Sequence, residues 1–162
     1  MLHSLDPKDP LWDHIWSPRL WNKVSTFLWL LCHKRILTWD NLIKRGFTRP
    51  SRCLNCNQHD ETIQHLMDLC NLSNKLWEKI SFKCQRSCRI SGDINNTIHN
   101  WALDPYNRRF LNSLWRLLSG LLLWTVWKER NTRIFKNECT SLEIIWRNFC
   151  HNIQETLSLQ SW

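Results

Sequence analysis

The feature that most constrains this chain is a group of cysteines and one histidine spaced as C-x2-C-x8-H-x4-C. Cys53, Cys56, His65 and Cys70 form the pattern and offer three thiolates and one imidazole within 18 residues. Tetrahedral Zn²⁺ prefers this set of donors in closed structural sites. Because four protein ligands leave no open position for water or substrate, the pattern favours a scaffold or binding role over zinc-dependent hydrolysis.

The histidine of this pattern has one rival in the sequence, His59. It lies in a polar Asn-Gln-His-Asp run that is typical of an exposed turn, whereas His65 follows Asp60-Glu61-Thr62, which is typical of a helix start capped by Asp60 or Thr62. We therefore predict that His65 is the fourth ligand, on a short helix that ends at Cys70. The alternative of ordinary buried thiols beside a surface histidine stays open, because eight cysteines and seven histidines raise the chance of an accidental match.

Composition predicts one mostly helical domain. Twelve Trp and six Phe are ample for a core, while three Gly and five Pro are too few for a multi-turn all-β protein. Residues 1–10 lack the apolar region of a signal peptide, so we expect an intracellular, reducing location in which cysteines bind metal. A secreted protein with four disulfides is the alternative that the even cysteine count leaves open. The most apolar stretch, 117–127, is shorter than the roughly twenty residues that span a bilayer, so no membrane partner is expected.

Hydrophobic periodicity divides the chain into helices and connections. Apolar residues recur at helical spacing in five stretches: 22–35, 38–46, 72–80, 109–136 and 141–157. The last two are separated by a short connection, which predicts an antiparallel hairpin packed by its tryptophans. The predicted fold is thus a small helical domain with a CCHC zinc-binding loop-helix and a C-terminal helical hairpin. Its expected parts are an irregular extension at 1–18, a zinc-binding domain at 19–83, a linker at 84–108 and the hairpin at 109–158.

The net charge of +8 is concentrated just ahead of the metal-binding pattern. Between Arg19 and Arg52 lie eight basic residues and one acidic residue, a net charge of +7, and this segment runs directly into Cys53. Such a segment is typical of a surface that contacts a phosphate backbone. The candidate phosphate contacts are Lys44, Arg45, Arg49 and Arg52. A basic face that only aids solubility is an equally good interpretation of the charge alone.

The sequence predicts no catalytic residues. Its three glycines are scattered, so a Gly-rich phosphate loop is excluded, and the sequence contains no H-E-x-x-H, G-x-S-x-G or EF-hand pattern. Polymerases need clustered carboxylates to hold two metals, but adjacent acidic residues occur once, at Asp60-Glu61, where helix capping is the expected role. Cys32 and His33 are neighbours on a predicted helix and point about 100° apart, so they form no nucleophile–base pair. We expect that the chain is not an enzyme.

Several motifs together resemble the zinc-binding domain of plant reverse transcriptases, which follows the polymerase in non-LTR, LINE-type retrotransposons. They are WNKVSTFLW at 21–29, RILTWDNL at 35–42, KRGF at 44–47, PSRC at 50–53 and ETIQHL at 61–66. The segment WTVWKERNTRIF at 124–135 is similar to the helical tail that often follows this domain. The resemblance covers most of residues 16–136, and the motifs are specific in combination.

The resemblance implies both a metal site and a set of packing positions. The implied zinc ligands are Cys53, Cys56, His65 and Cys70, and the implied packing positions are Phe27, Trp29, Leu42 and Trp77. Two positions depart from the family: Asn22 stands where Pro is usual, and Arg49 stands where Gly is common. Both changes affect turns rather than ligands. The sequence contains no polymerase or ribonuclease H motifs, so we expect a detached C-terminal piece of a retroelement.

These observations favour a zinc-binding module derived from a retrotransposon that binds nucleic acid, with RNA or single strands as the expected partner. In this interpretation the basic residues meet phosphates and Phe47 or Trp39 stacks on a base, although core packing is favoured for Trp39. Two alternatives stay open. One is a helical protein-interaction or structural module in which zinc only stabilises the fold, with protein partners unknown. The other is a degenerate retroelement relic.

Overall fold

The computed structural model confirms a mostly helical chain. It describes residues 10–16, 18, 20–48, 51–85, 93, 94, 96–98 and 109–158, and the side chains of residues 10, 14 and 109–113 are not among the described parts. Within these ranges there is no β-strand, and an isolated bridge pairs Arg52 with Asp60. The named helices are α1 (Pro10–Ile15), α2 (Asn22–Cys32), α3 (Trp39–Ile43), the π-helical turn η1 (His65–Leu69), α4 (Asn71–Cys84), α6 (Arg109–Lys136) and α7 (Leu142–Ser158).

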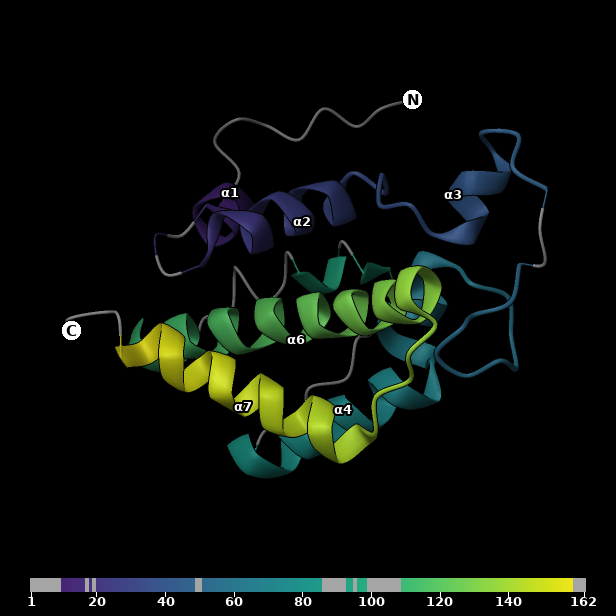
Figure 1. Cartoon of the computed structure of the whole chain (residues 1–162). Coiled ribbons are helices and arrows are strands. Elements are labelled where there is room, and N and C mark those ends of the chain that lie inside the picture. The colour runs from purple at the N-terminus through teal and green to yellow at the C-terminus, as the bar shows by residue number, and fades with distance from the viewer. Residues whose placement is uncertain are drawn as a thin grey trace.

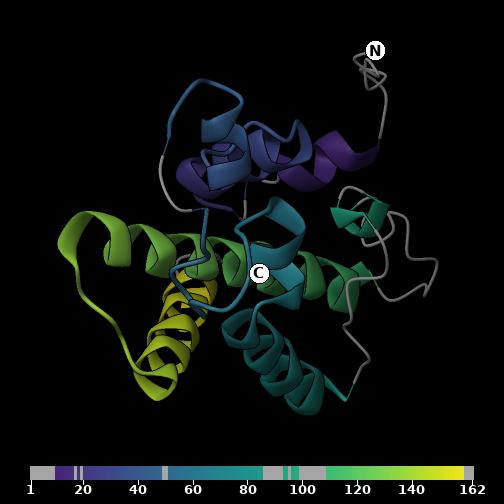
Figure 2. The ribbon, with the colours of Figure 1, turned by 90° about the vertical axis from the view of Figure 1, so that its right-hand side faces the viewer.

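The long helix α6 is the centre of the fold. Helices α1, α2 and α3 lie on one side of it and α4 and α7 lie on the other, as both views show (Figures 1 and 2). Helices α2, α4, η1 and α7 all pack against α6, and its middle residues Leu121, Leu122 and Val126 are buried. Gly120 lets α2 approach closely, because a Cβ at this position would lie 3.2 Å from Cδ1 of Leu28. The apolar stretch predicted as a core helix is therefore the core helix of the whole molecule.

The C-terminal hairpin forms as predicted, but two of its tryptophans contact α2 rather than α7. Helix α7 runs antiparallel to α6 and packs against it (Figure 1), with Ile145 and Phe149 buried. The rings of Trp124 and Trp127 instead lie against Phe27 of α2, at centroid distances of 5.4 and 6.0 Å. Trp124 and Trp127 thus join α6 to α2.

Two segments expected to be irregular contain ordered structure. Within the extension at 1–18, residues 10–15 form α1, which begins at a proline, the residue best suited to the first helical position, and buries Leu11 and Ile15. Within the expected linker at 84–108, Cys84 ends α4, and Ile94 and Ile98 are fully buried. Most of that range lies outside the described residues. The division of the chain into four parts stays a prediction.

The helix ends follow from local signals in most places. Helix α6 has the bounds predicted from the sequence, and the Ser141 hydroxyl accepts a hydrogen bond from the N–H of Ile144 at the start of α7, at 3.4 Å. Helix α3 starts after Thr38 as predicted, although the Thr38 hydroxyl donates to the Asp40 side chain and caps no backbone group. The turn after α3 closes at Gly46, whose φ of +88° is unfavourable for residues with a Cβ. Among the described helices, none is both long and apolar enough to cross a bilayer.

Candidate metal centre

The first two candidate ligands lie in a short loop that the backbone closes on itself. The N–H of Glu61 donates to the carbonyl of Ser51 at 2.7 Å, and the N–H of Cys53 donates to the carbonyl of His59 at 2.8 Å. Asn57 adopts a left-handed φ of +56°, a conformation that Asn tolerates better than most residues, and its N–H donates to the carbonyl of Cys53 at 2.7 Å. The loop turns tightly enough to bring Cys53 and Cys56 onto one side.

The other two candidate ligands lie on the helical turn that follows. The Thr62 hydroxyl accepts from the N–H of His65 at 3.0 Å, which confirms Thr62 as the capping residue. Asp60, the other capping candidate, instead accepts from the Ser51 hydroxyl. The wider π-helical turn η1 ends with the N–H of Cys70 donating to the carbonyl of His65 at 2.7 Å. His65 and Cys70 therefore face the cysteine loop from opposite ends of one turn.

The four side chains converge on one point. All the ligand atoms of Cys53, Cys56, His65 and Cys70 lie within 4.8 Å of one another. The Sγ atoms of Cys53 and Cys70 are 3.9 Å apart, and Sγ of Cys56 is 3.3 Å from Nε2 of His65. A tetrahedral ion with Zn–S bonds of about 2.3 Å requires S···S separations of about 3.8 Å, so the arrangement fits zinc closely. The structure thus brings together the four residues that the sequence pattern predicted.

His59 does not belong to this group. His59 is exposed, and its ring lies 5.3 Å from the ring of His65, centroid to centroid, while its backbone carbonyl closes the cysteine loop. His65 is buried, and the group that could hold a metal in the described residues contains His65. The choice of His65 over His59 from the sequence agrees with this geometry.

The electrostatics of the site favour a bound cation. The hydrogen bond from Cys53 to Cys70, together with burial, raises the pKa of the Cys53 thiol well above its usual range. The same hydrogen bond lowers the pKa of the Cys70 thiol. The N–H groups of Asn55 and Cys56 hydrogen-bond to Cys53 and oppose its shift. Two sulfurs at this distance cannot both be anionic unless a positive charge lies between them. A divalent cation supplies that charge, so a metal is the natural partner of the three thiolates.

Burial lowers the pKa of His65, and the nearby His59 adds to the shift. A lowered pKa keeps the imidazole neutral at pH 7, and the neutral form is the one that binds metal. Nε2 of His65 faces Cys56, so Nε2 is the nitrogen placed to coordinate.

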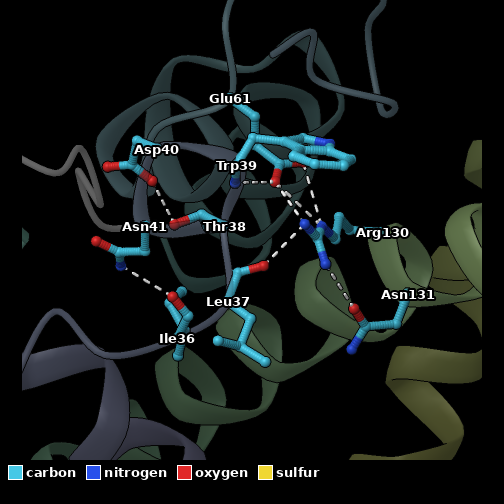
Figure 3. A network of polar contacts seen from close by, with 9 residues as sticks. All are labelled: Ile36, Leu37, Thr38, Trp39, Asp40, Asn41, Glu61, Arg130 and Asn131. Carbon is cyan, nitrogen blue, oxygen red and sulfur yellow. Dashed lines mark hydrogen bonds and ion pairs between the residues drawn. The ribbon is translucent and has the colours of Figure 1, made fainter. Parts of the chain in front are cut away.

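A buried ion pair joins the metal loop to the central helix. The guanidinium of Arg130 on α6 lies 2.7 Å from the Glu61 carboxylate through Nη2, and both side chains are almost fully buried. Nη2 of Arg130 also donates to the carbonyl of Leu37 at 2.9 Å, and Oε1 of Glu61 accepts the N–H of Trp39 at 3.0 Å (Figure 3). Glu61 thereby caps α3 from outside that helix. The sequence-based expectation that Asp60-Glu61 caps the helix carrying His65 was wrong for Glu61, whose carboxylate accepts from the start of α3 instead.

A second arginine of α6 contacts the cysteine loop itself. Nη1 of Arg133 donates to the carbonyls of Leu54 and Asn55 at 2.9 and 3.0 Å, and its Nε donates to Glu129 at 2.7 Å. Those two carbonyls belong to the residues between Cys53 and Cys56. Arg133 therefore fixes the loop that must stay tight for both cysteines to reach one ion. Sequence reasoning missed the role of both arginines, because they lie in a charged part of α6 where exposed side chains are expected.

The candidate phosphate contacts lie on the surface. Lys44, Arg45 and Arg52 are exposed, whereas Arg49 lies outside the described residues. Of the two aromatic candidates, Phe47 is 56% exposed and Trp39 is half-buried. Among the other residues implied by the resemblance, Phe27 and Trp77 are buried, and Nε1 of Trp77 donates to the carbonyl of Met67 at 2.9 Å.

Residues 1–77 match the family model described as zinc-binding in reverse transcriptase. This segment is similar to that family. It contains all four candidate ligands, so the family and the donor set agree on zinc as the ion. A protein of Arabidopsis thaliana named "Putative ribonuclease H protein" is 24% identical to the chain over 123 residues. That alignment covers 75% of this chain but 19% of the relative, so the chain spans about a fifth of the relative's length. The comparison with solved structures found no match.

Proposed function

We propose that this chain is a zinc-stabilised nucleic-acid-binding module of retrotransposon origin, with RNA or another single strand as its ligand and no catalytic activity of its own. The observation that carries the proposal is the position of the exposed basic residues beside the metal site. Arg52 directly precedes Cys53, and the N–H of Asp40 in α3 donates to the carbonyl of Glu61 at 3.3 Å. The metal loop therefore positions both Arg52 and the basic end of α3.

Three further observations support the proposal. The segment from Arg19 to Arg52 carries a net charge of +7, and Phe47, two residues after Arg45 in the sequence, has an exposed ring on which an unstacked base can stack. The matched family is part of reverse transcriptases and the Arabidopsis thaliana relative is named for ribonuclease H, and both activities act on nucleic acid. The motif resemblance and this plant relative together support a plant LINE-type element as the origin.

The test is to remove the positive charges of Lys44, Arg45 and Arg52, the candidate phosphate contacts that the structure describes. We expect the triple variant Lys44→Gln, Arg45→Gln, Arg52→Gln to bind a labelled single-stranded oligouridylate more weakly. The slope of log affinity against log salt should fall in magnitude by about 2, because each phosphate contact on a single strand contributes about 0.7. Fluorescence anisotropy titrations at several salt concentrations measure both quantities.

A charge-matched control separates this surface from net charge. The triple variant Lys128→Gln, Lys136→Gln, Arg147→Gln removes three exposed charges from α6 and α7. We expect it to keep the salt slope of the original protein. Equal effects of the two triple variants, or no effect of either, would refute the assignment of this surface.

A second function is favoured by a different observation. Exposed apolar side chains lie near the metal loop and at the end of α6, among them Leu69 at 65% and Phe135 at 79% exposure. Such side chains are typical of a surface that docks a protein partner. A zinc-stapled interaction module would retain a partner in a pull-down, lose it on substitution of Leu69 and Phe135 by Ser, and show no shift with RNA.

A further inference from the structure

A groove lies between α4 and α7, on the side of the molecule away from α3. Both helices pack against α6 (Figures 1 and 2), and the space between them has a volume of about 370 Å³. That volume is within the range of small-molecule sites, and the groove is open to solvent along α4, so it is large enough to hold part of an extended single strand. Its lining residues are Lys75, Glu78, Lys79, Phe82 and Lys83 from α4 and Trp146 from α7.

The lysines of the groove form one row. Lys75, Lys79 and Lys83 are spaced by four residues, so their side chains leave α4 on the same face at intervals of about 6 Å. Successive phosphates of an extended single strand have a comparable spacing. Lys79 and Lys83 also act electrostatically on Cys150 of α7, where they oppose the rise that burial causes in the pKa of its thiol. Their charges therefore face the space between the two helices.

The groove also offers two aromatic rings. Trp146 is half-buried and forms one wall, and Nζ of Lys79 lies 5.8 Å from the centre of its ring. Phe82 is 83% exposed, the largest exposed fraction among the apolar side chains of the described residues. A cation row beside exposed rings is the combination with which proteins bind single strands without sequence preference. A chain of acidic residues alone, such as polyglutamate, would use the lysines but has no ring to stack on Phe82.

We propose that the α4–α7 groove is a second binding site for single-stranded nucleic acid, with Lys75, Lys79 and Lys83 on successive phosphates and Trp146 and Phe82 stacking on bases. This site lies across α6 from α3 and uses none of the residues assigned to the surface beside the metal. The occupant is recognised by its phosphates and base rings together, not by charge alone.

The test uses the zinc-loaded full chain and a labelled single-stranded oligoadenylate. We expect Lys75→Gln, Lys79→Gln, Lys83→Gln to lower the magnitude of the salt slope by about 2. We expect Phe82→Ala to weaken binding by about 5- to 150-fold, the range that one stacked base contributes, with the salt slope unchanged. Phe82 is on the surface, so this variant keeps the fold, whereas Trp146→Ala is informative only if its circular dichroism spectrum is unchanged. Glu78→Gln removes the one acidic side chain of the groove and should tighten binding.

The outcomes distinguish this site from the surface beside the metal. If the Lys44, Arg45 and Arg52 variant weakens binding and the groove variants do not, the groove proposal is refuted and the proposed function stands. If only the groove variants weaken binding, the groove proposal stands and the surface beside the metal loses its role. The proposal would be overturned if polyglutamate competed as strongly as oligoadenylate and Phe82→Ala left the affinity unchanged. Those two results together would mean that the groove binds an acidic protein.

Discussion

At the scale of single residues, the site depends on Cys53 more than on any other ligand. Cys53 is fully buried, its thiol contacts Cys70, and its backbone N–H and carbonyl both close the loop. We expect the purified protein to contain one equivalent of zinc and Cys53→Ser to contain almost none, by metal analysis. Cys139→Ser, at an exposed free cysteine, is the control and should retain the metal. Full zinc content in Cys53→Ser would contradict the ligand set.

His65 should make zinc retention depend on pH. Because its pKa in the folded protein is lowered below the ordinary value of 6.5, the unfolded chain takes up the proton more readily. Its contribution to stability is therefore complete above about pH 6.5 and is lost as the pH falls through the lower folded pKa. We expect zinc release, followed with a chromogenic chelator, to steepen on acidification below pH 6.5. His65→Ala should release zinc already at pH 7, whereas His59→Ala should retain zinc at pH 7 and release it at a slightly higher pH than the original protein, because His59 contributes to the lowered pKa of His65.

The ligands could be predicted from the sequence, but the residues that hold them could not. Cys53 to Cys70 spans one loop and one turn, so spacing and donor type were enough to select them. Glu61 and Arg130 are 69 positions apart, and only the packing of α6 against the metal loop brings them together. An acidic residue next to a capping Thr has a simpler local explanation, and that explanation was wrong for Glu61.

At the scale of elements, the Glu61–Arg130 pair connects three segments: the metal loop, α3 and α6. The Glu61 carboxylate is fully buried, so removal of Arg130 leaves a buried negative charge without a partner. We expect Arg130→Met to lower the free energy of unfolding by about 3–5 kcal/mol, measured by denaturant titration of the zinc-loaded protein. The double variant Glu61→Gln, Arg130→Met removes both charges and should recover a substantial part of that loss. If the loss of unfolding free energy in the double variant equalled the sum of the losses in the two single variants, the two side chains would not act as a pair.

Helix positions could be predicted well because periodicity and capping are local properties. The bounds of α6 and the start of α3 are examples, since each depends on residues within one or two turns. The packing of the aromatic residues could not be predicted in the same way. Trp124 and Trp127 lie on a helix with two apolar faces, and the sequence does not say which face meets α7 and which meets α2. Likewise, Ile94 and Ile98 lie in a polar stretch whose burial depends on the rest of the fold.

At the scale of the whole molecule, the zinc-binding segment and the C-terminal helices share one core. The family match ends at residue 77, inside α4, yet α2, η1 and α4 all bury apolar residues against α6. Arg130 and Arg133 of α6 add polar contacts to the metal loop. The zinc-binding segment therefore depends on helices that follow it in the sequence.

We expect the zinc-loaded full chain to unfold in one cooperative transition and to lose stability on chelation, since structural zinc contributes about 10–16 kcal/mol to folding in finger peptides. A fragment of residues 1–83 lacks α6, so it should give a broad, weak transition and bind zinc less tightly than the full chain. Thermal unfolding followed by circular dichroism, with and without chelator, measures both effects. Two separate transitions in the full chain, or a fragment as stable as the whole, would show that the zinc-binding segment folds independently and that α6 only rests on its surface.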